Sequence, residues 1–281
     1  MLEYLFNPAE SQLLLKTYKN PSKFSNEEVA LFRIKITEAA GSKDILPDTL
    51  CWSKDFTFGY NEPLVHEYFL HPAFKSYPVV GVSYLQAISY CNWLTRRENK
   101  VRTEKGLPLL PGYRLPTEIE WEFAARGEMN RKKNTGIENK TTSEKEEEIK
   151  TDFPWDAQFS NATHSRGKYF ANIKTGPSNY IEDNYEYTAP VKSFPANTFG
   201  LFEMAGNVSE WTADVFEFHH SPETANISPA QIPNDAQNLR VVKGGSWADY
   251  KYAAMCGSRT GLDGNKGYAR VGFRVARNNE D

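Results

Sequence analysis

The most informative stretch of the sequence for the fold is Asn197-Thr-Phe-Gly-Leu-Phe-Glu-Met-Ala-Gly-Asn-Val-Ser-Glu-Trp211. It places two carboxylates, Glu203 and Glu210, on either side of a Gly206-Asn207 turn, with backbone carbonyl groups between them. Short turning loops that gather carboxylate and carbonyl oxygens are typical of calcium sites. From these residues alone, a surface turn with two exposed glutamates is the simpler interpretation.

Regular structure is predicted on both sides of this stretch. Ser83 is a plausible N-cap for a helix with apolar residues at helical spacing from Tyr84 to Leu94. Thr117-Glu-Ile-Glu120 is a capping box, and Gly127 ends the helix that follows. Residues 239–247 and 270–277 predict short strands, and a further helix is expected over residues 27–36.

The rest of the sequence is rich in proline, glycine and asparagine. Residues 49–82 contain prolines at 63, 72 and 78, which favours ordered loop and short strand over long helix. Thirteen of the 25 residues from 128 to 152 are charged, so that range is predicted to be a solvated surface insertion. We therefore expect one α+β domain over residues 1–281, with little regular secondary structure.

Composition excludes several classes of protein. There are 33 Lys and Arg residues against 36 Asp and Glu residues, a net charge of −3, so nucleic acid is not an expected partner. No apolar run reaches the roughly 18 residues of a membrane span, and the first residues do not resemble a signal peptide. The three cysteines, Cys51, Cys91 and Cys256, allow at most one internal disulfide.

Four segments in a fixed order resemble the formylglycine-generating-enzyme (sulfatase-modifying factor) family from about residue 77 to the C-terminus. They are Pro78-Val-Val-Gly-Val-Ser83, the range 112–127, the range 197–211, and Lys243-Gly-Gly-Ser-Trp247 together with Val271-Gly-Phe-Arg274. The resemblance implies an irregular C-type-lectin-like fold. Further stretches of the sequence, including Tyr60-Asn-Glu-Pro63 and Gly257-Ser-Arg-Thr260, are similar to sequences of the family branch found in gliding-motility and type IX secretion lipoproteins. Residues 1–76 would then be a branch-specific N-terminal part.

The resemblance also implies two calcium sites. The first would take side-chain oxygens from Glu203 and Glu210 and backbone oxygens from Gly206 and Val208. The second would take side-chain oxygens from Asn172 and Asp183 and backbone oxygens from Ile173 and Tyr185.

The copper chemistry of the family's oxidases is not expected here. Those enzymes bind copper through two cysteines that follow the Gly-Gly-Ser-aromatic motif, and thiolate is the ligand that Cu(I) prefers. Asp249 stands at the first of these positions, and the second falls in residues 252–254, which contain no sulfur. By resemblance, Cys256 is a structural cysteine whose usual disulfide partner corresponds to Ala125, and the partner of Cys91 corresponds to Val275. No catalytic residue is assigned.

Three functions remain open from the sequence. The leading one is a non-catalytic structural or binding module of a cell-envelope assembly, whose partners are other envelope proteins. It would be extracytoplasmic, on the periplasmic face of the outer membrane, although no lipobox cysteine is visible. The second is an oxidase that uses Met255 and Cys256, and the third is a carbohydrate- or peptide-binding domain that acts alone.

Overall fold

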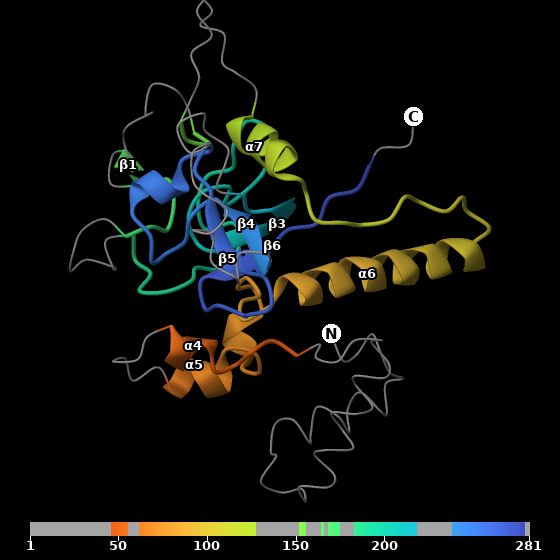
Figure 1. The fold of residues 1–281 in the computed structure, drawn as a ribbon, viewed down its shortest axis with the longest axis horizontal. Coiled ribbons are helices and arrows are strands. Elements are labelled where there is room, and N and C mark those ends of the chain that lie inside the picture. Colours follow the sequence, from red (N-terminus) through yellow and green to blue (C-terminus); the bar gives the residue numbers. More distant parts are fainter. Residues whose placement is uncertain are drawn as a thin grey trace, which may run out of the picture.

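The computed structural model describes residues 46–55, 62–127, 152–155, 164–165, 168–174, 183–217 and 238–278 (Figure 1). The helix expected over residues 27–36 and nearly all of the charged insertion at 128–152 lie outside these ranges. Within them, short helices and a small sheet are joined by long irregular segments, which confirms the irregular α+β class expected from the sequence.

Both predicted helices are present, and both begin with a capping box. α6 spans Tyr84–Glu104, and the Ser83 side chain accepts a hydrogen bond from the Gln86 N–H while Gln86 bonds back to the Ser83 N–H. α7 spans Glu118–Arg126, where Thr117 and Glu120 form the same reciprocal pair. It ends at Gly127, whose φ of 66° is one that glycine adopts without strain.

A four-stranded sheet forms the centre of the molecule. Its strands, in the order β5-β4-β3-β6, are β5 (Thr260–Asp263), β4 (Leu239–Lys243), β3 (Ser209–Val215) and β6 (Val271–Phe273). β3 pairs with β4 in antiparallel fashion and with β6 in parallel fashion, with Glu210 opposite Gly272. A separate antiparallel pair is formed by β1 (His164–Ser165) and β2 (Lys168–Tyr169).

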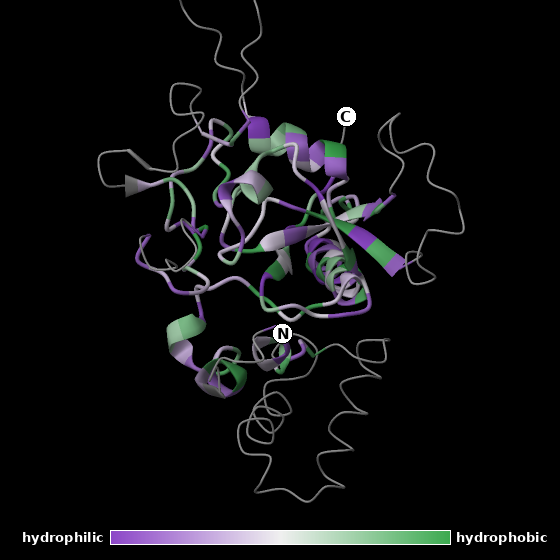
Figure 2. Cartoon of the chain, turned by 60° about the vertical axis from the view of Figure 1, so that its left-hand side comes forward, coloured by the Kyte–Doolittle hydropathy of each residue, from purple (hydrophilic) through white to green (hydrophobic). Residues whose placement is uncertain are grey.

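The sheet lies between α6 on one side and α7 on the other (Figure 1). Trp211 faces α6, where it packs with Ala87 and Cys91 in one buried cluster. Its neighbour Glu210 faces the opposite way and contacts α7 through Trp121, because successive strand residues point to opposite faces. Hydrophobic and hydrophilic residues are therefore interleaved along the ribbon of the central body (Figure 2).

The structure differs from the predictions of local structure in two places. In the described parts of residues 49–82, short helices take the place of the expected strands: α4 (Cys51–Lys54), α5 (Glu62–Glu67) and a 3-10 turn (Pro72–Phe74). Trp52 stabilises this region, since it is fully buried, lies 5.0 Å from Tyr68 and stacks on Trp247 at 6.2 Å (ring centroids). β3 was not predicted, because its buried residues include the polar Ser209, Glu210 and Thr212.

The loop before β3 depends on a glycine that packs against backbone. Gly206 has a φ of +71°, and a Cβ added there would lie 2.3 Å from the Asn172 carbonyl oxygen. Gly106, beyond the end of α6, has a similar φ of +66°, but a Cβ added at Gly106 would have no neighbouring atom within 4 Å. The two glycines therefore share the conformational requirement and differ only in the space around them.

We expect Gly106→Ala to lower the free energy of unfolding by about 1–2 kcal/mol, the cost of a left-handed alanine. Gly206→Ala should cost at least about 2 kcal/mol more, because the Asn172 backbone must move away. Urea unfolding of both variants measures the difference directly. Equal losses would mean that the Asn172 contact is not tight in the folded protein.

Candidate functional site

The loop that leads into β3 is held by side-chain to backbone hydrogen bonds. Asn207, with a φ of 62°, accepts the Ala189 N–H (2.9 Å) through Oδ1 and donates to the Ala189 carbonyl (3.1 Å) through Nδ2. Its own N–H donates to the Asn172 carbonyl (2.8 Å), and its carbonyl accepts the Trp247 N–H (3.0 Å). Asn207 thus joins three separate segments, which brings the first predicted calcium set beside Asn172 of the second.

Glu210, a member of that first set, is almost completely buried and forms an ion pair with Arg274. Arg274 donates through Nε to Oε2 and through Nη2 to Oε1 (2.8 Å), while the indole N–H of Trp121 also donates to Oε2 (2.7 Å). Arg274 Nη2 further donates to the carbonyls of Phe202 (3.1 Å) and Glu203 (3.3 Å). Burial disfavours the charged guanidinium, but the adjacent Glu210 carboxylate raises the pKa of Arg274 overall.

The guanidinium of Arg274 therefore donates hydrogen bonds to the oxygens that a metal cation would coordinate at this loop. One carboxylate and two backbone carbonyls surround it, which is the kind of oxygen set that Ca²⁺ also prefers. Since Arg274 already matches the charge of Glu210, Glu210 fits the role of an ion-pair partner better than that of a calcium ligand. The sequence reasoning missed this partner, because Glu210 and Arg274 lie 64 residues apart in the sequence.

The other residues of the first set are also in contact with protein groups. The Glu203 carboxylate accepts the N–H groups of Lys192 (3.0 Å) and Phe194 (3.3 Å), so it fixes the turn at residues 192–194. Val208 is buried in the cluster of Trp247, and the Gly206 N–H donates to the Gly244 carbonyl (2.8 Å). Through these hydrogen bonds and this apolar packing, the residues of the first set stabilise the loop by contacts within the protein.

The second predicted set fits calcium better. Asn172 and Asp183 are 1% and 4% exposed, and burying a carboxylate is costly unless its charge is matched. Asn172 donates through Nδ2 to the Tyr187 carbonyl (2.7 Å), and Asp183 accepts the Tyr185 N–H (3.0 Å) through Oδ1. The donor set that the resemblance implies here, one carboxylate, one amide oxygen and the carbonyls of Ile173 and Tyr185, consists of the hard oxygens that Ca²⁺ prefers.

A different kind of metal site finds little support in the part of the chain that the structure describes. No group of three or more His, Cys, Asp or Glu side chains comes together there. The three thiols are buried, and burial raises the pKa of Cys51 and Cys256 to about 12 and that of Cys91 to about 11. Such thiols stay protonated at neutral pH, whereas Cu(I) is bound by thiolate.

The position of the first copper cysteine in the resemblance holds a charged network instead. Asp249 accepts the hydroxyl hydrogen of Ser246 through Oδ2, and its Oδ1 lies 3.4 Å from Nη1 of Arg270. Ser246 is completely buried, so this carboxylate orders the turn that follows Gly245. Cys256 packs with Ala125 in one apolar cluster, as the resemblance implies for the former disulfide position.

A buried lysine, Lys243 at the end of β4, joins α7 to the sheet. The Lys243 ammonium is completely buried and lies 2.8 Å from Glu122 Oε1 and 3.5 Å from Glu118 Oε1. Glu118 also lies 3.0 Å from Arg259 Nε. Sequence reasoning placed Lys243 in a strand motif but found no partner for it, because both glutamates are more than 100 residues away in the sequence.

Comparison with known proteins gives a consistent result. The model of the family described as "Sulfatase-modifying factor enzyme 1-like domain" matches residues 65–279. The chain is 34% identical over 209 residues to the formylglycine-generating enzyme of Mus musculus, covering 72% of this chain and 44% of that protein. It is 31% identical over 207 residues to the inactive C-alpha-formylglycine-generating enzyme 2 of the same organism, covering 71% of this chain and 48% of that protein.

Among solved structures, Treponema denticola variable protein 1 aligns with a TM-score of 0.45 and 24% identity, covering 73% of this chain and 72% of that one. The matched region spans less than half the length of the two mouse relatives. With more than three quarters of its residues matched by the family model, the chain belongs to the family of sulfatase-modifying factor enzyme 1-like domains.

Proposed function

We propose that the protein is a non-catalytic, calcium-stabilised structural or binding module of a bacterial cell-envelope assembly of the gliding-motility or type IX secretion type. The observation that carries the proposal is the Asp249–Ser246–Arg270 network, which stands where the resemblance places the first copper cysteine. An ion pair there orders a turn, whereas the oxidase reaction needs a metal-bound thiolate. The inactive mouse relative gives further support, because its name records loss of activity within this family.

The branch motifs support a proposal for the place and partners of the module. We propose an extracytoplasmic location on the periplasmic face of the outer membrane, with other envelope proteins as partners. No helix in the described ranges is long and apolar enough to cross a membrane, in agreement with the expectation from the sequence.

Calcium would act through the second set, where Asn172 and Asp183 supply buried side-chain oxygens and Ile173 and Tyr185 supply carbonyls. Bound there, the ion would match the charge of Asp183 and join residues 172–173 to residues 183–185. The Asn172 carbonyl also accepts the N–H of Asn207, so this site would stabilise the loop before β3 indirectly. At the first set, Arg274 already supplies a positive charge to Glu210.

A chelator should lower the melting temperature of the calcium-loaded protein. A ligand that binds only the folded state at one hundred times its dissociation constant stabilises that state by about 2.7 kcal/mol. For a domain of this size, this corresponds to a shift of roughly 5–11 °C. Differential scanning calorimetry with EGTA, and then with added CaCl₂, measures the shift and its reversal.

Two variants separate the candidate calcium sets. Asp183→Asn keeps the shape of the side chain but removes its charge, so it should remove most of the response to calcium. Glu210→Gln should lower the melting temperature with or without calcium, because it leaves the half-buried Arg274 without a carboxylate to match its charge. A calcium response that vanishes in Glu210→Gln and persists in Asp183→Asn would place the ion at the first set instead.

We expect no conversion of a cysteine-containing sulfatase peptide to formylglycine under aerobic conditions with added Cu(I). The reason is the ligand set: Asp249 is engaged with Ser246 and Arg270, and the pKa of Cys256 is raised to about 12 by burial. Mass spectrometry of the peptide, with the mouse formylglycine-generating enzyme as positive control, is the measurement. A mass change that disappears in Cys256→Ser would establish the oxidase alternative.

A further inference from the structure

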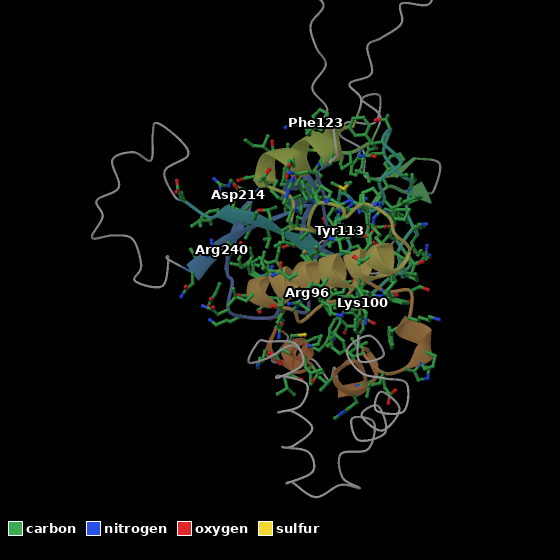
Figure 3. All side chains as sticks on the ribbon, turned by 90° about the vertical axis from the view of Figure 1, so that its right-hand side faces the viewer. Arg96, Lys100, Tyr113, Phe123, Asp214 and Arg240 are labelled. Carbon is green, nitrogen blue, oxygen red and sulfur yellow. The ribbon has the colours of Figure 1, made fainter. Side chains whose placement is uncertain are left out.

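Three large apolar side chains are exposed side by side on α7 and on the loop next to it. Ile119, Phe123 and Phe199 are 81%, 67% and 41% exposed. Ile119 and Phe123 are one helical turn apart on the same face of α7, and the ring centroids of Phe123 and Phe199 lie 5.5 Å apart. Figure 3 shows Phe123 on the side of α7 that is turned away from the sheet. These three residues form the α7 patch.

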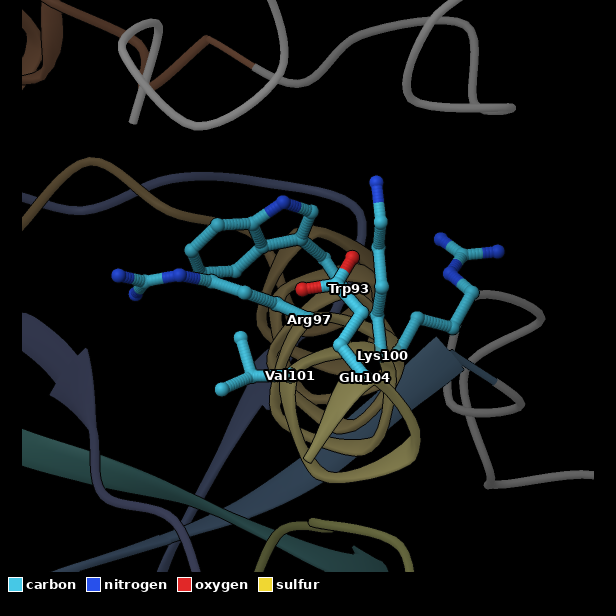
Figure 4. Close-up of a pocket in the computed structure, with 6 residues that line it drawn as sticks. Trp93, Arg97, Lys100, Val101 and Glu104 are labelled. Carbon is cyan, nitrogen blue, oxygen red and sulfur yellow. The ribbon is translucent and has the colours of Figure 1, made fainter. Parts of the chain in front are cut away.

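Clustering distinguishes the α7 patch from single exposed apolar residues. On α6, for comparison, the exposed Val101 lines a cavity of about 400 Å³ whose other residues are mostly charged (Figure 4): Arg96, Arg97, Lys100 and Glu104. Apolar side chains that are exposed singly among charged ones are normal on a protein surface. A contiguous group of three, two of them aromatic, is instead typical of a surface that binds another molecule.

The loop that carries Phe199 is held against α7 by Asn197. The Asn197 side chain donates through Nδ2 to the carbonyls of Ala124 (2.6 Å) and Ala125 (3.2 Å). These carbonyls belong to the last turn of α7, where a helix leaves such groups without helical partners. Through Oδ1 the same side chain accepts the N–H of Phe199 (3.0 Å). The fold itself therefore places Phe199 beside Phe123.

The size of the α7 patch favours a short segment over a second copy of this chain. The exposed parts of the three side chains amount to roughly 350 Å², if a fully exposed side chain of this size offers ~200 Å². A stable dimer buries about 800 Å² on each partner, and the α7 patch supplies less than half of that area. One helix that presents two or three apolar side chains matches the available surface.

The surroundings of the α7 patch favour a protein helix over an added strand or a lipid. A helix uses its backbone groups in its own hydrogen bonds, so α7 offers no edge to which a strand could be added. Next to Ile119, the hydrogen bond from Arg114 lowers the pKa of Glu120 to about 2. The half-exposed Glu120 carboxylate is therefore charged at neutral pH, and moving a charged carboxylate into the apolar part of a bilayer is costly.

We infer that the α7 patch binds an amphipathic helix of a protein partner. The partner helix would lie along α7 and present apolar residues at positions i, i+4 and i+7, which lie on one face of a helix. The inference rests on the proposed function, for which it supplies a partner-binding surface. Its test involves neither calcium nor copper, so the two proposals fail separately.

Peptide display against the full-length protein tests the inference. The library consists of 16-residue peptides with helix-favouring residues at fixed positions and random residues along one face. The most enriched peptide is synthesised with a fluorescent label, and its affinity is measured by anisotropy. The decisive variant is Phe123→Ser. The matched control is Leu85→Ser, which removes a 59% exposed apolar side chain from α6, on the other side of the sheet.

The enriched peptides should carry apolar residues along the random face. Phe123→Ser should weaken binding at least tenfold, as expected for a central aromatic contact, whereas Leu85→Ser should change it less than twofold. Each variant should shift the melting temperature by no more than about 3 °C, because both side chains lie at the surface. No enrichment, or enriched peptides that bind Phe123→Ser as tightly as the wild type, would overturn the inference.

Other occupants of the α7 patch would give different results, and each of them would overturn the inference. Flotation of the protein with phosphatidylglycerol vesicles that is lost in Phe123→Ser would identify a lipid surface. A dimer in analytical ultracentrifugation that Phe123→Ser dissociates would identify a second copy. A melting temperature that falls far more in Phe123→Ser than in Leu85→Ser would show that the chain itself covers Phe123.

Discussion

The ion pair between the buried Glu210 and the half-buried Arg274 is the interaction on which the rest of the structure depends. It joins β3 to the chain just beyond β6, and through Trp121 it also holds α7. The same guanidinium binds two carbonyls of the loop before β3. Removing Arg274 would leave the buried Glu210 carboxylate without a matching charge; the cost is about 3–5 kcal/mol where both partners are fully buried, and the partial exposure of Arg274 lowers it here. This ion pair therefore contacts the sheet, α7 and the loop before β3 at one point.

Among the described residues, charge pairing recurs at two further places close to the sheet. Lys243 holds α7 through Glu118 and Glu122, and Arg270 matches Asp249 in the turn after Gly245. A fold with little regular secondary structure has many backbone groups that no helix or strand satisfies, and these must bond elsewhere. Asn207 serves this need as well, because its side chain bonds to both backbone groups of Ala189.

Local rules were sufficient to predict the helices but not the central strand. Ser83 and Thr117 carry capping-box sequences whose partners lie three residues away, so the start of each helix is encoded nearby. β3 contains a buried glutamate whose partner lies 64 residues later, and no periodicity of hydrophobic residues reveals it. The short helices of residues 51–67 were missed for a similar reason, since the burial of Trp52 against Trp247 is a tertiary contact. The candidate site shows the same division: family resemblance supplied both predicted calcium sets, whereas the contact of Arg274 with the loop before β3 depends on the whole fold.

The long separation of Glu210 and Arg274 in the sequence has a consequence for synthesis. A ribosome adds roughly 5–20 residues per second, so the 64 residues between Glu210 and Arg274 take about 3–13 seconds to appear. During that interval β3 has neither its parallel neighbour β6 nor the cation that its glutamate needs. The pairing of β3 with β6 can form only after β6 has left the ribosome, and until then this edge of β3 is open to chaperones and proteases.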